Sequence, residues 1–250
     1  MRADVQRHRV GAVTDKKKGA YRMTGFTGIT AEALFLLAEN RFQDSKTFYE
    51  EHKPAIVAGV VQPLRRLVEE LAPTMLQIDP LLVTDPLRNG TVSRVRRDNR
   101  FTKDKHLYRE NMWIALLRDK HAYDGGVPAF FMDFSLQGAE WGMGFYSITP
   151  AVMQTLRGFA KERPHRVEEA ILTAQKAGFP MTGVPYARPR STDVTPPLLR
   201  PLYDCKSVMF CRHEPADFVA DPHLAETLSR GYTALAPFYR LFIEALEMTE

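Results

Sequence analysis

Residues 112–147 of this chain read MWIALLRDKHAYDGGVPAFFMDFSLQGAEWGMGFYS, and this stretch decides the fold class. It contains three short runs rich in apolar or aromatic residues, at 112–117, 129–136 and 141–147. The turn signals between them, Asp124-Gly125-Gly126 and Gly138, leave connections that are long enough for hairpins and too short for helical crossovers. The stretch therefore predicts consecutive antiparallel strands.

A fourth strand is expected just before this stretch. Residues 91–97 form a short run with β-branched side chains and follow Asn89-Gly90, a strong turn signal. We therefore expect an antiparallel meander of about four strands over residues 91–147. Gly138, Gly142 and Gly144 around Trp141 indicate either a bulge or bend, which is the preferred interpretation, or a place where the backbone can approach a ligand.

Helical patterns fill the chain before the sheet. A first helix is expected over about residues 30–40, and Asp44 or Ser45 is a suitable N-cap for the next one. Pro63 can begin a further helix, since proline is tolerated in a first turn. Pro73 is expected to stop that helix.

Helical patterns return after the sheet. Thr149-Pro150 has the form of an N-cap followed by a first-turn proline, and another helix is expected over residues 164–178. Residues 179–201 are rich in proline and predict an irregular loop. A last strand is expected at residues 206–211, and a final helix over about residues 223–248.

These patterns predict one α+β domain over residues 24–250, in which the meander packs against N-terminal and C-terminal helices. The 250 residues are 44% hydrophobic, which is enough to form a substantial core. Residues 1–23 are polar and basic without apolar periodicity, so we expect a flexible leader. Met23 lies at the end of this leader, and a second interpretation of the leader is that translation starts at Met23.

The formal net charge is +4 and the isoelectric point is near 9.0, but the positive charge is concentrated in two places. Residues 1–23 hold seven basic and two acidic residues, so the rest of the chain carries a net charge of −1. Residues 94–109 also hold seven basic and two acidic residues. After residue 23, positive charge is therefore focused on one short stretch, which indicates a local anion site and not a long nucleic-acid track.

The basic stretch reads RVRRDNRFTKDKHLYR over residues 94–109. The turn before it favours a strand that runs into a loop, although the same residues also fit helical spacing. Planar guanidinium groups bind phosphate and carboxylate with paired hydrogen bonds, so a small anion can lie among them. The expected ligand-binding residues are Arg94, Arg97, Arg100, Lys105 and Tyr108.

Three interpretations of this stretch remain open. In the first, it binds a small phosphate- or carboxylate-bearing ligand, and Asp98, His106 or Tyr108 moves a proton while the arginines hold charge. In the second, it is a non-catalytic surface for an acidic protein or a nucleic-acid backbone. In the third, it is a structural ion-pair network with Asp98 or Asp104 as the partner, and Tyr108 is a buried anchor.

The stretch also resembles the signature of a bacterial family known as domain of unknown function 2461 (DUF2461). The matching pattern is Arg94-x-x-Arg97-Asp98-x-Arg100-Phe101-x-x-Asp104-Lys105-x-x-Tyr108. The likeness extends over about residues 26–245 and includes Gly142-x-Gly144-x-Tyr146. This chain has His106-Leu107 where the family often has a proline. The resemblance implies a single domain of the family's fold and implies no activity.

No metal site and no cofactor are predicted. His213, His223 and Asp221 are possible ligands, but nothing in the sequence brings them together. Cys205 and Cys211 fit no zinc pattern and are expected to be reduced thiols. The chain has no apolar run long enough for a membrane span or a secretory signal, so we expect a cytoplasmic protein. The sequence does not define the oligomeric state.

Overall fold

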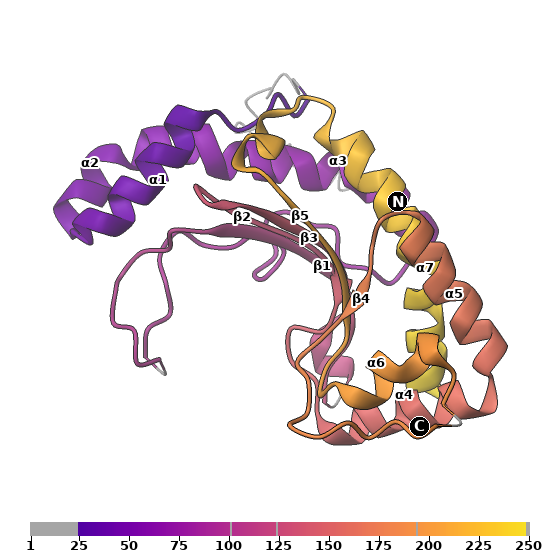
Figure 1. The fold of residues 1–250 in the computed structure, drawn as a ribbon. Helices are drawn as coiled ribbons and strands as arrows, with labels where there is room; N and C mark the ends of the chain where they lie inside the picture. Colours follow the sequence, from indigo (N-terminus) through magenta and orange to yellow (C-terminus); the bar gives the residue numbers. More distant parts are fainter. Residues whose placement is uncertain (1–24, 101, 124, 194, 249–250) are drawn as a thin grey trace, which may run out of the picture.

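The computed structural model describes residues 25–100, 102–123, 125–193 and 195–248, which form a curved five-stranded sheet backed by helices (Figure 1). The strands are β1 (Met112–Leu117), β2 (Ala129–Ser135), β3 (Gly138–Gly144), β4 (Met181–Thr182) and β5 (Met209–Glu214). Their order is β1-β2-β3-β5-β4, and all neighbours are antiparallel. The predicted α+β class is therefore confirmed. The leader expected at residues 1–23 lies outside the described residues.

The α-helices are α1 (Ala31–Gln43), α2 (Lys46–Ile56), α3 (Gln62–Ile78), α4 (Pro150–Glu162), α5 (Pro164–Lys176), α6 (Arg200–Asp204) and α7 (Leu224–Glu247). A π-helical turn, η1 (Val57–Val61), joins α2 to α3, and short 3₁₀ turns are η2 (Lys120–Ala122), η3 (Pro197–Leu199) and η4 (Ala216–Ala220). Figure 1 shows α3, α5 and α7 along the convex side of the sheet.

The two faces of the sheet differ in burial because side chains alternate along each strand. Ile114, Met132 and Trp141 are aligned across β1, β2 and β3, and all three are buried under the helices. Tyr232 of α7 packs against Trp141 and donates a hydrogen bond to the backbone oxygen of Phe131 at 3.0 Å. These contacts fix α7 on the convex face.

The concave face carries the alternate positions, and no described α-helix covers it. We call this surface the open face. It includes Trp113 and Leu117 of β1, and Phe131, Asp133 and Ser135 of β2, all of which are partly exposed. An aromatic and polar sheet face that is left accessible offers room for a ligand.

The predicted ends of two helices are wrong. The helix expected to stop at Pro73 continues to Ile78, because Leu71, Met75 and Ile78 extend its buried stripe and their burial outweighs the hydrogen bond that proline removes. The helix expected to end near Asn40 continues to Gln43 and is closed by Asp44 in the left-handed conformation. Both helices therefore continue past the residue that was expected to end them. The strand expected at residues 206–211 is β5, which lies three positions later at Met209–Glu214.

The strand expected at residues 91–97 does not form, and this expectation is also wrong. Val92 makes a single bridge to Ile114 at the edge of β1, and Arg96 makes a separate bridge to Tyr108. The first half of the segment therefore adds to the sheet, whereas the second half pairs with the returning end of its own loop. The chain leaves the sheet between them because the loop is bonded to the α1–α2 junction.

Candidate functional site

The basic loop, residues 94–109, projects from the body of the protein beside the sheet (Figure 1). Its two ends pair through backbone hydrogen bonds, from Arg97 N to Leu107 O at 2.8 Å and from Arg109 N to Val95 O at 2.9 Å. The loop is therefore an irregular hairpin, and the helical alternative for this stretch does not hold. Asp44 binds it to the helices, since its Oδ1 accepts a hydrogen bond from Leu107 N at 2.7 Å.

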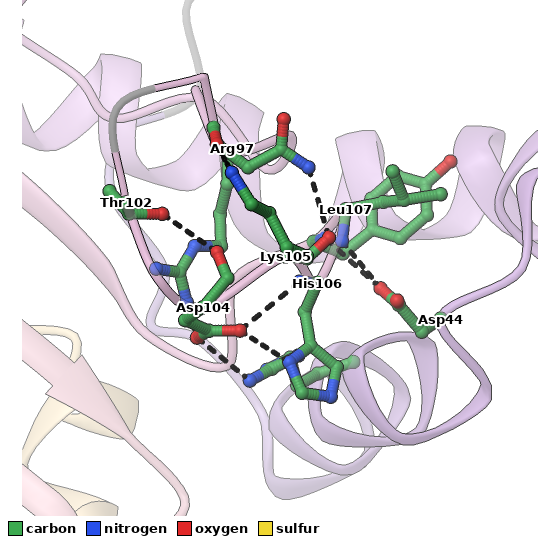
Figure 2. Close-up of polar contacts among 10 residues, drawn as sticks. Asp44, Arg97, Thr102, Asp104, Lys105, His106 and Leu107 are labelled. Atoms are coloured by element: carbon green, nitrogen blue, oxygen red, sulfur yellow. Dashed lines mark hydrogen bonds and ion pairs between the residues drawn. The ribbon is translucent and has the colours of Figure 1, made fainter.

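Asp104 is the centre of the polar contacts within the loop (Figure 2). Its carboxylate accepts hydrogen bonds from Arg97 Nη1 and, at 3.3 Å, from Arg41 Nη2 of α1. The second oxygen accepts from the backbone N of His106 at 3.1 Å and contacts the imidazole Nδ1 at 2.5 Å. One carboxylate thus neutralises two arginines and joins the loop to α1.

The other expected ligand-binding cations have separate partners. Arg100 binds Asp98 through two hydrogen bonds, Nε to Oδ1 at 2.9 Å and Nη2 to Oδ2 at 2.7 Å, which lower the pKa of Asp98 to about 2. Arg94 Nη2 donates to Asn89 Oδ1 at 2.9 Å, and Lys105 Nζ donates to the backbone oxygen of Asn99 at 3.1 Å. The four cations therefore do not share one bound group.

Tyr108 and His106 were the candidate proton carriers besides Asp98. Tyr108 is only 2% exposed and stacks on Tyr49 with ring centroids 4.7 Å apart, and burial raises its pKa. This is the arrangement of a buried anchor. His106 is oriented by Asp104 as a catalytic imidazole is oriented by a carboxylate, but no hydroxyl or thiol of the described residues hydrogen-bonds to its Nε2. For Arg97, Arg100 and Tyr108 the geometry favours the structural interpretation.

Replacing Asp104 with alanine is expected to destabilise the protein by about 1–2 kcal/mol, because Arg41 and Arg97 then lose their shared carboxylate. Asp98→Ala is the matched control on the same loop, since the carboxylate of Asp98 binds the exposed Arg100 two positions away and does not join the loop to a helix. Urea unfolding followed by circular dichroism measures the free energy of unfolding of the two variants. Equal stability of the two variants would show that the Asp104 contacts do not fix the loop.

The open face carries a polar row that the sequence analysis missed. Trp113, Asp133, Glu140 and His213 are aligned across β1, β2, β3 and β5. Asn111 donates a hydrogen bond to Asp133 at 2.6 Å, and burial raises the pKa of Asp133 to about 6. The available signal was a single acidic residue within each of two otherwise largely apolar strands, Asp133 in β2 and Glu140 in β3.

A second unpredicted feature is a cavity of about 450 Å³ beside α4. We call it the basic pocket, and its lining residues are Gln154, Arg157, Gly158, Lys161, Arg190 and Tyr203. None of the six is acidic. The four α4 residues lie on one side of the helix because they are separated by three or four positions.

Arg157 lies in the basic pocket and is 8% exposed. Its Nε donates to the backbone oxygen of Leu202 at 3.1 Å, and its Nη2 donates to that of Cys205 at 2.8 Å. Its Nη1 donates to Gln154 Oε1 at 3.2 Å. Within the described part of the chain, Arg157 forms no ion pair with a carboxylate. Its hydrogen bonds are satisfied, but its charge is not neutralised.

Fold and sites together define an α+β domain with a helix-backed antiparallel sheet, an open polar face and an ion-paired basic loop. The chain belongs to the family described as Conserved hypothetical protein (DUF2461), whose model matches residues 32–241. The resemblance drawn from the basic stretch is thereby confirmed. The family is one of unknown function, and no curated protein and no solved structure matches this chain. Among the described helices, none has the length and apolar character to cross a membrane.

Proposed function

We propose that the protein binds a small ligand bearing a phosphate or carboxylate group, and that this group lies in the basic pocket. The observation that carries the proposal is the buried guanidinium of Arg157, which has no carboxylate partner among the described residues. A buried charge without a counter-charge is costly, so an anion that enters the pocket gains a favourable interaction.

The surroundings of Arg157 add positive charge. Lys161 and Arg190 also line the cavity, and neither forms an ion pair within the described residues. Three cations around one cavity produce a positive potential that attracts anions. Gln154 and Tyr203 supply neutral polar groups at the same cavity, which are suited to orienting the rest of a ligand.

Arg190 is held in position before any ligand binds. Its guanidinium carbon lies 3.5 Å from the ring centroid of Tyr186, and its backbone N donates to Asp204 Oδ1 at 2.7 Å. Arg157 approaches the same tyrosine ring, at 5.7 Å from the centroid. Stacking of this kind orders a long side chain in advance and so lowers the entropic cost of binding.

The test is a thermal-shift measurement with inorganic phosphate, phenyl phosphate and citrate, at constant ionic strength and with chloride as reference. Binding to the folded state raises Tm. We expect Lys161→Gln and Arg190→Gln each to weaken the affinity at least about tenfold, or about 1.4 kcal/mol. Arg157 is not the residue to vary, because its guanidinium also binds the backbone next to α6.

Variants of the basic loop serve as the matched control. Arg94→Gln and Lys105→Gln are expected to leave anion binding unchanged. If these variants lose binding while Lys161→Gln and Arg190→Gln retain it, the ligand lies at the basic loop, as the sequence predicted. If none of the three anions raises Tm, the proposal is wrong.

A second candidate function is an interaction surface on the basic loop. Arg94, Arg96, Lys103 and Lys105 are exposed, and none of them pairs with a carboxylate in the described part of the chain. A projecting loop with exposed cations suits an acidic protein surface or a nucleic-acid backbone. Such binding should weaken steeply with added salt. Affinity that is insensitive to salt would exclude this role.

We also infer that the protein acts in the cytoplasm. Both cysteines, Cys205 and Cys211, are free and buried, as is usual for proteins of a reducing compartment. Fractionation of cells that express the native chain tests this inference.

A further inference from the structure

We propose that Glu140, Cys211 and His213 bind a divalent transition-metal ion on the open face, and that zinc fits this set best. Glu140 and His213 are direct register partners on β3 and β5, and Cys211 lies two positions before His213 on the same face. One ligand atom from each residue lies within 4.8 Å of the others, and His213 Nε2 is 3.9 Å from Glu140 Oε1.

The donor set selects the class of metal. A thiolate, an imidazole and a carboxylate together suit zinc and its neighbours, whereas calcium and magnesium prefer oxygen ligands alone. Zinc binds sulfur at ~2.3 Å and nitrogen at ~2.0 Å, which places neighbouring ligand atoms roughly 3.5 Å apart. The observed separations need only small side-chain rotations to reach this geometry.

The thiol of Cys211 is buried, since the residue is only 5% exposed. Its direct partner on β3 is Gly142, which leaves room beside the sulfur because it has no side chain. The Cys211 Sγ contacts Thr182 Oγ1 at 3.7 Å and also interacts with Glu140. The side chain of His213 is 77% exposed, so the buried thiol is the fixed member of the set and the histidine is the adaptable one.

Three protein ligands leave a fourth position for water, as in catalytic and not in structural zinc sites. Asp133 is the register partner of Glu140 on β2, so a second carboxylate lies beside the ligand set. Such a group is suited to accept a hydrogen bond from metal-bound water. The site lies on β3 and β5, whereas the basic pocket is built on α4, α6 and the 183–200 segment. Metal binding and anion binding can therefore succeed or fail separately.

The experiment is a titration of the full-length, untagged and metal-free protein with Co²⁺, followed by competition with Zn²⁺. Cobalt bound to a thiolate gives a ligand-to-metal charge-transfer absorption that carboxylates and imidazoles do not give. We expect one ion per chain, this absorption, and its displacement by Zn²⁺. His213→Gln and Glu140→Gln should weaken binding at least about tenfold.

Cysteine variants identify the sulfur. Cys211→Ser should remove the absorption, whereas Cys205→Ser should retain it, because Cys205 lies at the end of α6 and outside the cluster. His213→Gln keeps the test decisive if Cys211→Ser does not fold, since the exposed imidazole is not needed for packing. The proposal is overturned if the wild-type protein shows no thiolate absorption, or if His213→Gln binds cobalt as tightly as the wild type.

Discussion

Replacing Asp79 with alanine is expected to lower the free energy of unfolding by about 2–3 kcal/mol, because it removes a buried carboxylate that binds both Arg118 and Tyr239 and leaves Arg118 paired with the more exposed Glu247. Asp79 follows α3 and is 4% exposed. Its carboxylate accepts hydrogen bonds from Arg118 Nε at 2.5 Å and from Tyr239 Oη at 2.6 Å. It therefore joins α3 and α7, which back the sheet, to the segment that follows β1.

The effect should depend on pH with a defined sign. Burial acts to raise the pKa of Asp79, but hydrogen bonds from Arg118 and Tyr239 outweigh it and hold the pKa below its ordinary value. A carboxyl group whose pKa is lower in the folded state stabilises that state when ionised. The contribution is complete above about pH 4, and it is lost as the pH falls through the folded-state pKa. The difference between wild type and Asp79→Ala should therefore shrink in acid.

Asp85→Ala is the matched control. Asp85 Oδ1 accepts a hydrogen bond from Leu87 N at 2.8 Å, just as Asp79 Oδ1 accepts one from Leu81 N at 2.9 Å. Asp85 is exposed and forms no ion pair within the described residues, so its loss should cost less than about 1 kcal/mol. Urea unfolding at pH 7 and pH 3 measures both variants. Similar destabilisation by the two substitutions would mean that the Arg118 and Tyr239 contacts contribute little.

Elements whose signals are local could be predicted from the sequence. The hairpins of residues 112–147 follow from short apolar runs separated by glycine turns, and α4 begins at Thr149-Pro150 as expected. The pairing of Arg97 with Asp104 was also within reach, because the two residues are seven positions apart. In each case the interactions that decide the structure join residues that are close together in the sequence.

Contacts between distant segments could not be predicted in this way. Asp79 is 39 positions from Arg118 and 160 positions from Tyr239, so no spacing rule connects them. His213 was considered as a metal ligand with sequence neighbours, whereas the register of β3 and β5 brings it to Glu140. In the sequence, nothing distinguishes Arg157 from other charged residues in a helical pattern. Its burial is evident only once the 183–200 segment and α6 are placed over α4.

The register of β3 and β5 also places Gly142 where a larger residue does not fit. Gly142→Ala is therefore expected to destabilise the protein by at least about 3 kcal/mol. Gly142 has φ +156°, and a Cβ atom built there would lie 1.9 Å from the backbone oxygen of Phe210 on β5. Backbone atoms of a paired strand cannot move aside as a side chain can. The substitution must therefore separate β3 from β5 or bend one of them away.

Gly158→Ala provides the matched control for this last substitution. Gly158 lies within α4, and a Cβ atom there meets no heavy atom within 4 Å. Alanine favours the helical state over glycine, so this variant should be more stable than the wild type by about 0.5–1 kcal/mol. The two variants add the same methyl group, and urea unfolding should show that their free energies of unfolding change in opposite directions.

Because β3 and β5 carry Glu140, Cys211 and His213, Gly142→Ala should also abolish cobalt binding under conditions where it remains folded. If Gly142→Ala is as stable as Gly158→Ala, the backbone of β5 does not exclude a Cβ atom at position 142.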